Sequence, residues 1–190
     1  MTQTLSSTIR NGVDTTQMFG TLDAIKGNGE LGAFVFRATN RWINGAHNRS
    51  TIKGFYGAGG EDATRTEKFL LDAGEPAVLL GTDTGPNPAE YLLHALAACL
   101  TTTLVYSAAA RKVRLTEVES TFEGEMDVRG CLGIDDSYRN GFTKIRATFS
   151  IKGDAPDDVL KAIVANAQKR SAVYDMVANG VPVEIEAVTP

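Results

Sequence analysis

The stretch Gly85–Lys112, GPNPAEYLLHALAACLTTTLVYSAAARK, decides the fold. It opens with helix-start signals: Asn87 can cap a helix, Pro88 suits the first helical position, and Glu90 stands three residues after the cap. Residues 91–110 carry no formal charge, and two basic residues follow where they favour a helix C-terminus. A long uncharged helix that is apolar on nearly every face is predicted to be buried all round.

The same stretch is long enough to span a membrane, since about 20 apolar residues suffice. However, much of its apolar character comes from alanine, and it contains three threonines, a serine and a histidine. It also stands alone between strand-like polar segments, which is not typical of a membrane span. We therefore predict a central helix wrapped by sheet, and no membrane partner.

Segments rich in β-formers or with alternating polarity lie on both sides of this helix. The predicted strands cover residues 33–43, 49–56, 65–71, 117–129, 142–151 and 181–188. Two further helices are predicted, a short amphipathic one within 12–26 and another at 158–170. This order indicates an α+β fold with antiparallel strands around a long buried central helix. We expect residues 1–30 to form an N-terminal tail (flexible over 1–10) and short helix, and residues 31–190 a single domain.

One chain supplies little sheet and helix to enclose a helix that is apolar all round. A second copy would provide the missing cover. A symmetric homodimer in which the two central helices pack together is therefore predicted.

The composition excludes several classes of function. The net charge of −4 and the pI of about 5.2 argue against a nucleic-acid surface. The N-terminus has no apolar core of the kind a signal peptide needs, and two cysteines do not make a disulfide scaffold, so a cytoplasmic protein with reduced thiols is expected. His47 and His94 have no ligand partners at metal spacing, so no metal is expected. Gly27–Gly32 has the letters of the dinucleotide fingerprint, but a helix precedes it and a strand follows, so it is interpreted as a turn and no cofactor is predicted.

The segment Gly85–Glu90, followed by Ala97-Ala98-Cys99-Leu100, resembles the OsmC/Ohr family of osmotically inducible and organic hydroperoxide resistance proteins. The similarity extends from Arg37 onward and includes Arg41-Trp42 and Tyr174-Asp175. The resemblance implies an OsmC-like fold and an intertwined homodimer with the two long helices at its centre. It also implies thiol-dependent reduction of organic hydroperoxides, in which the helix cysteine becomes a sulfenic acid and a dithiol partner restores it.

Only one of the two cysteines matches a cysteine position of the family. Cys99 matches the helix cysteine, while Ser171 stands where the hydroperoxide-reducing members carry a resolving cysteine, and serine cannot form the disulfide. Cys131, in a predicted loop, is either a rearranged partner of Cys99 or an unpaired cysteine. Cys99 is either a thiolate nucleophile or a small buried hydrophobe. Because it lies in the middle of its helix, no help from a helix N-terminus is expected, and a cation would have to lower its pKa.

The charged groups of the family site match only approximately. The family's glutamate corresponds to Ala89, with Glu90 one place later, about 13.5 Å along the helix axis from Cys99. Glu90 is therefore either a cap for its own helix or a group that reaches the partner subunit's site. The family's arginine corresponds to a position near Ala46, so Arg49, and secondarily Arg41, are candidates to place a guanidinium near the thiolate, unless both are ordinary surface residues.

The sequence is compatible with two functions. The first is an OsmC-like thiol peroxidase in which Cys99 reduces an organic hydroperoxide, with an incomplete catalytic set and an external thiol as reductant. The second is a non-catalytic binding module that keeps a hydrophobic pocket at the dimer interface. The mismatches at Ala46, Ala89 and Ser171 favour the second function, and the presence of Cys99 favours the first.

Overall fold

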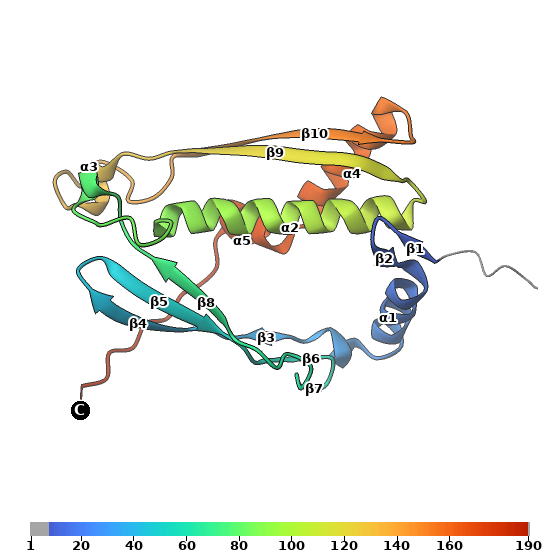
Figure 1. Cartoon of the computed structure of the whole chain (residues 1–190), viewed down its shortest axis with the longest axis horizontal. Helices are drawn as coiled ribbons and strands as arrows, with labels where there is room; N and C mark the ends of the chain where they lie inside the picture. The colour runs from blue at the N-terminus through green and yellow to red at the C-terminus, as the bar shows by residue number, and fades with distance from the viewer. Residues whose placement is uncertain (1–7, 190) are drawn as a thin grey trace, which may run out of the picture. The chain divides into compact units, whose positions relative to one another are not determined.

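The computed structural model describes residues 8–189. The chain divides into two compact units, one containing Asp14–Leu92 and the other containing Ile9–Val13 together with the chain from Leu93 onward. Figure 1 labels the helices and strands of both units, which are described separately below.

The first unit begins with α1 (Thr15–Gly27) and the short 3-10 helix η1 (Gly29–Gly32). Asp14 caps α1, because its carboxylate accepts hydrogen bonds from the N–H groups of Thr16 and Gln17. The predicted short helix is therefore confirmed, and the segment with fingerprint letters is a tight turn between a helix and a strand.

Two three-stranded antiparallel sheets complete the first unit. One contains β4 (Thr39–Asn44), β5 (His47–Ile52) and β8 (Phe69–Ala73), in the order β4-β5-β8. The other contains β3 (Val35–Phe36), β6 (Phe55–Gly57) and β7 (Gly60–Glu61). Each of the first two predicted strands is thus split into two pieces that belong to different sheets. A 3-10 helix, η2 (Ala77–Leu79), interrupts the connector that follows β8.

The second unit begins with a small hairpin of β1 (Ile9–Arg10) and β2 (Val13–Asp14). The turn residue Asn11 ties this hairpin down, since its amide donates to the Val113 carbonyl and accepts from the Leu115 N–H, both at 2.9 Å. The prediction of a flexible tail is wrong for residues 9 and 10, where these two hydrogen bonds fix the hairpin; residues 1–7 lie outside the described part of the chain.

The central helix α2 (Pro88–Ala110) forms as predicted and is the longest helix in Figure 1. By length and composition it could cross a membrane, but the core helix of a water-soluble protein meets the same criterion, so this is weak evidence. Its buried side chains are Leu96, Leu100, Leu104, Ala108 and Ala109. Most of these residues recur every fourth position, so they form one buried stripe along the helix. The prediction that all faces of the helix are buried is therefore wrong for a single chain.

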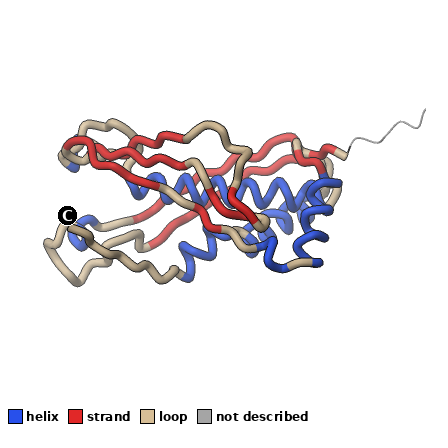
Figure 2. The backbone as a smooth tube through the Cα atoms, turned by 90° about the horizontal axis from the view of Figure 1, so that it is seen from below, coloured by secondary structure: helices blue, strands red, loops and turns tan. Residues whose placement is uncertain are grey.

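Beyond α2, a long antiparallel hairpin of β9 (Leu115–Glu125) and β10 (Lys144–Gly153) is followed by α4 (Asp157–Arg170). The short helix α3 (Val128–Cys131) lies in the connection between the two strands. Figure 2 shows the hairpin in red beside the helices in blue. The apolar core lies between the hairpin, α2 and α4; its buried members are Leu104, Ala108, Val113, Leu160, Ile163 and Ala167.

The C-terminal region differs from the prediction. A helix that the sequence reading missed, α5 (Ala172–Asn179), follows α4, and the strand predicted at 181–188 has no sheet partner within residues 8–189. The side chains of Val183 and Ile185 in this segment are 74% and 92% exposed. An alternating segment becomes a strand only where another strand pairs with its N–H and C=O groups, and within residues 8–189 no strand pairs with this segment.

Candidate functional site

Cys99, on α2, lies against the start of α5. The Ser171 hydroxyl donates a hydrogen bond to the Cys99 sulfur at 3.1 Å, and the same oxygen accepts from the Tyr174 N–H at 3.1 Å. Ser171 is the N-cap of α5 and is only 2% exposed, whereas Cys99 is half-buried. The hydroxyl therefore links the thiol directly to the first turn of a helix.

The junction between α4 and α5 holds Ser171 in place. Its N–H bonds to the Ala167 carbonyl at 2.8 Å and ends α4, while its extended backbone and side chain begin α5. The buried residues Leu160 and Ile163 anchor α4 in the core of the unit. One residue thus serves as C-cap and N-cap at once, which leaves the hydroxyl little freedom to move.

The surroundings of Cys99 lower the pKa of its thiol. Partial burial is the largest single influence and raises the pKa, but hydrogen bonds outweigh it. The strongest of these comes from Ser171, followed by the backbone N–H groups of Val173 and Ala172. The Thr103 hydroxyl, which donates to the Cys99 carbonyl at 2.8 Å, contributes least. The expectation that only a cation could activate Cys99 is therefore wrong, because a second helix supplies the N-terminal N–H groups that its own helix cannot.

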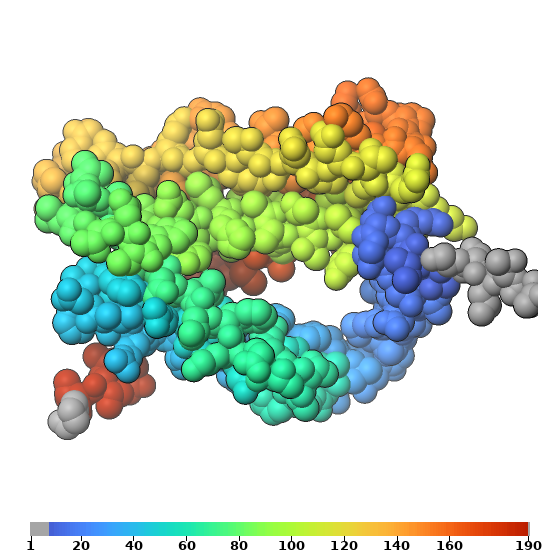
Figure 3. Space-filling model, in the orientation of Figure 1, coloured from blue at the N-terminus to red at the C-terminus, as the bar shows by residue number. Residues whose placement is uncertain are grey.

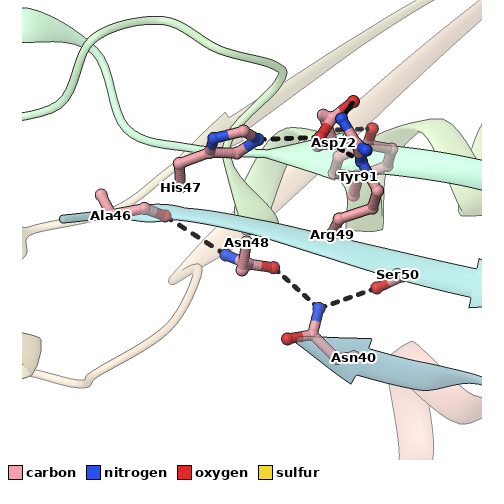
Figure 4. A network of polar contacts seen from close by, with 8 residues as sticks. All are labelled: Asn40, Ala46, His47, Asn48, Arg49, Ser50, Asp72 and Tyr91. Carbon is pink, nitrogen blue, oxygen red and sulfur yellow. Dashed lines mark hydrogen bonds and ion pairs between the residues drawn. The ribbon is translucent and has the colours of Figure 1, made fainter. Parts of the chain in front are cut away.

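The candidate Arg49 lies in the first unit, within a polar network on β5 and β8 (Figure 4). Its guanidinium binds both carboxylate oxygens of Asp72, at 2.8 and 3.1 Å, and His47 reaches the same carboxylate at 2.8 Å. The Tyr91 hydroxyl donates to the Asp72 carbonyl at 2.6 Å, so the first turn of α2 is tied to β8. The Arg49 guanidinium, foremost through its hydrogen bond, holds the pKa of the Asp72 carboxyl below its usual value.

The other charged candidates also lie in the first unit. Arg41 faces Arg49 directly across β4 and β5 and takes part in no ion pair among residues 8–189. Glu90 forms the predicted capping box: its carboxylate accepts from the Asn87 N–H, and the Asn87 side chain accepts from the Glu90 N–H, each at 2.8 Å. Within the second unit, the structure brings the candidates Cys99 and Ser171 into contact.

Cys131 is an exposed free thiol at the end of α3, where its S–H donates to the Val128 carbonyl at 3.3 Å. Cys99 is also free. Within residues 8–189 no group of three or more His, Cys, Asp or Glu side chains could hold a metal ion.

The sequence reading missed the part of the site that α5 provides, although a signal was present. Ser171 is a good N-cap, and Val173, Met176 and Val177 follow it with the spacing of a helix face. The family resemblance identifies position 171 as a lost cysteine and says nothing about its capping role. Chemically, the arrangement offers a half-buried thiol with a lowered pKa beside a hydroxyl rather than beside a second thiol.

Comparisons with known proteins identify the family. The family model described as OsmC-like protein matches residues 81–186, more than half of the chain, which includes α2, Cys99 and Ser171. No curated protein matches the sequence.

Solved structures show the same fold at low sequence identity. An OsmC-like protein from Mycoplasma pneumoniae aligns with a TM-score of 0.59 and 14% identity, over 76% of this chain and 87% of that one. An OsmC-like protein of unknown function from Vibrio cholerae aligns with a TM-score of 0.51 and 15% identity, over 74% and 92%. A Legionella pneumophila protein, described as an organic hydroperoxide resistance protein OsmC and predicted redox protein, aligns with a TM-score of 0.50 and 18% identity, over 77% and 90%. The match of the family model to more than half of the chain, on a fold shared with these proteins, establishes that the chain belongs to the OsmC-like protein family.

Proposed function

We propose that this protein is a thiol-dependent peroxidase that reduces an organic hydroperoxide at Cys99 and relies on an external thiol for its return to the reduced state. The observation that carries the proposal is the Cys99 sulfur held by Ser171 and the first N–H groups of α5, which together lower the pKa of the thiol. The Legionella pneumophila relative is named an organic hydroperoxide resistance protein, which supports the same chemistry.

The reaction needs only the thiolate, the hydroperoxide and a proton. The Cys99 sulfur attacks the terminal peroxide oxygen, the O–O bond breaks, and the departing alkoxide takes up a proton to become an alcohol. Cys99 is thereby oxidised to a sulfenic acid. With serine at position 171, an external thiol condenses with the sulfenic acid and releases water, and a second thiol frees Cys99 and leaves as a disulfide. We place this cycle in the reducing cytoplasm, where small thiols are abundant.

The test is peroxide consumption by the purified protein. Cumene hydroperoxide should be consumed in the presence of a dithiol, and dimedone should label Cys99 after peroxide treatment. Cys99→Ser should abolish both effects. Cys131→Ser is the matched control and should leave both unchanged, because the Cys131 thiol is bonded only within its own short helix. An unlabelled Cys99 together with undiminished peroxide would exclude the proposal.

We propose in addition that the protein works as an intertwined homodimer in which the C-terminal segment of one copy joins the sheet of the other. The hairpin segregates its charges by strand: β10 presents Lys144, Arg146 and Lys152, and β9 presents only acidic partners opposite them. The outward face of β9, in yellow, lies along the surface in Figure 3. In the described chain β10 pairs only with β9, so its outer edge is free.

The segment 181–188 fits that edge in both charge and shape. Glu184 and Glu186 alternate with Val183 and Ile185, so on a strand the carboxylates would meet the basic side chains of β10 while the apolar side chains point to the other face. On that face a groove of about 380 Å³ runs between β10 and α4. Its lining consists of Ala147, Phe149, Ile151, Leu160 and Val164, with Asp157 and Lys161. A second copy would thus pair a segment that is otherwise exposed.

A non-catalytic binding function is the second candidate. The observation in its favour is that both charged groups suggested for catalysis already have partners, Arg49 in an ion pair with Asp72 and Glu90 in a capping box. In that case a hydrophobic pocket at the dimer interface would bind a small apolar ligand without chemistry. The probe is cumyl alcohol, which cannot oxidise a thiol. If cumyl alcohol raises the melting temperature of the native protein and of Cys99→Ala equally, that result would favour this function over peroxide reduction.

A further inference from the structure

We propose that the chemical state of Cys99 controls the stability of α5, so that covalent modification of the Cys99 sulfur loosens this helix. The inference deepens the proposed function by naming a regulatory consequence at the same site. It rests on that function only for the identity of the physiological oxidant.

The start of α5 depends on one buried hydroxyl. The helix has only eight residues and no fully buried side chain, so the packing of its own side chains stabilises it weakly. Its cap is the Ser171 oxygen, which accepts the Tyr174 N–H, while the Ser171 proton is directed to the Cys99 sulfur. With Ser171 only 2% exposed, water has little access to replace either partner.

The coupling between sulfur and helix must act in both directions. The N–H groups of Ala172 and Val173, together with the Ser171 hydroxyl, stabilise the negative sulfur. By thermodynamic linkage, the negative sulfur stabilises the same turn of α5 to the same extent. Any reaction that removes the charge from the sulfur therefore removes this stabilisation from the helix.

Covalent modification removes the charge and also occupies a lone pair. A hydroperoxide and a proton convert the thiolate into a neutral sulfenic acid and release an alcohol. Methyl methanethiosulfonate transfers its methylthio group to the thiolate and releases methanesulfinate, which leaves a neutral methyl disulfide on Cys99. In the methyl disulfide the sulfur is a poor hydrogen-bond acceptor and the added methylthio group brings no better one, so the buried Ser171 hydroxyl loses its partner.

The experiment measures hydrogen exchange of α5 before and after modification of Cys99. Cys131→Ser is the starting protein, so that Cys99 is the one thiol available to methyl methanethiosulfonate. We expect amide exchange in the peptide that covers Ala172–Asn179 to accelerate roughly three- to tenfold, the effect of losing one hydrogen bond of ordinary strength beside the cap. The peptide that covers α4 should not change, which shows that the protein stays folded.

A second variant isolates the hydroxyl. In Ser171→Ala, made in the same starting protein, the amides of α5 should exchange rapidly even before Cys99 is modified. Modification should then increase their exchange rate little. Unchanged α5 exchange after complete modification of Cys99 would overturn the inference, as would equal acceleration in α4 and α5, because that result indicates general unfolding.

A hydroperoxide arm separates this inference from the proposed function. If cumene hydroperoxide oxidises Cys99 and accelerates α5 exchange, both stand. If methyl methanethiosulfonate accelerates exchange while the hydroperoxide leaves the thiol intact, the coupling is correct and the peroxidase proposal fails.

Discussion

At the scale of single residues, Ser171 defines what this site can do. A hydroxyl at 3.1 Å from the Cys99 sulfur stabilises a thiolate but cannot resolve a sulfenic acid. The same position in hydroperoxide-reducing relatives, according to the sequence resemblance, carries a cysteine. Serine at this position therefore keeps a hydrogen bond that lowers the pKa of the Cys99 thiol and cannot form an internal disulfide.

The reactivity of Cys99 should depend on pH in a way that reports on Ser171. Since hydrogen bonds lower the pKa of the Cys99 thiol in the folded protein, its alkylation by iodoacetamide should have a midpoint below that of the guanidinium-unfolded chain. In Ser171→Ala the midpoint should rise, and the rate at a pH of about 7 should fall roughly three- to tenfold. The measurement is the alkylation rate against pH by mass spectrometry, with Ser171→Thr as the variant that retains the hydroxyl. Identical profiles for the native protein and Ser171→Ala would contradict the assignment.

The same shift predicts a small dependence of stability on pH. A thiol whose pKa is lowered on folding contributes stability that is fully present above its unfolded-state pKa and is lost as the pH falls through its folded-state pKa. The free energy of unfolding, measured by urea titration at a series of pH values, should follow this trend in the native protein and lose that component in Cys99→Ala.

Ser171→Cys should restore the internal disulfide. The native oxygen already lies within hydrogen-bond distance of the Cys99 sulfur, and sulfur is larger with a longer bond to Cβ, so the two sulfurs can meet after a small movement. Cumene hydroperoxide should then produce a loss of both thiols and of dimedone labelling, measured by intact mass in a Cys131→Ser background. A persistent, dimedone-reactive sulfenic acid in this variant would show that the side chains cannot approach.

At the scale of elements, helix ends decide the chemistry and the connections. The capping box of α2 could be read directly from the sequence, because Asn87 and Glu90 are three residues apart and act locally. The start of α5 could not, since its importance comes from a contact with Cys99, 72 residues earlier in the chain. Local patterns therefore predicted the central helix, the hairpin of β9 and β10, and α4. Contacts between distant residues decided which of those elements form the site.

Gly85, in the connector before α2, should be intolerant of a side chain. A Cβ at this position would overlap the backbone carbonyl of Asp72, the group that accepts the Tyr91 hydroxyl. We expect Gly85→Ala to lower the free energy of unfolding by about 1–3 kcal/mol, because backbone rather than a flexible side chain must move. Urea unfolding provides the measurement. The matched control is Gly54→Ala, whose Cβ would meet nothing within 4 Å; equal destabilisation by both substitutions would refute the steric reason.

At the scale of the whole molecule, the single chain leaves apolar surface uncovered. The central helix buries one stripe of side chains, while Tyr106 is 51% exposed and Leu92 is 40% exposed. The sequence predicted this shortage of cover, because one chain has few elements to wrap a helix that is apolar all round. It could not predict that the C-terminal segment would lack a strand partner, since alternation reveals a strand but not the chain with which it pairs.

The proposed dimer should therefore depend on the charges of its C-terminal segment. Replacing Glu184 and Glu186 by lysine places positive charges beside Lys144, Arg146 and Lys152 on β10, where like charges on neighbouring strands repel. We expect the dimer to dissociate at least about tenfold more readily, as measured by sedimentation equilibrium at low salt. Glu184→Gln with Glu186→Gln should have a smaller effect. A monomeric native protein, or a lysine variant that dimerises normally, would exclude this mode of assembly.

The segregated charges of the hairpin have a further consequence for the newly made chain. If two β10 edges approached each other antiparallel, a row of lysine and arginine would meet its own copy, and two β9 edges would bring rows of glutamate together. Either encounter is repulsive, so the hairpin discourages the edge-to-edge association that leads to aggregation. The free edge of β10 is thereby protected from pairing with its own copy while the chain is being made.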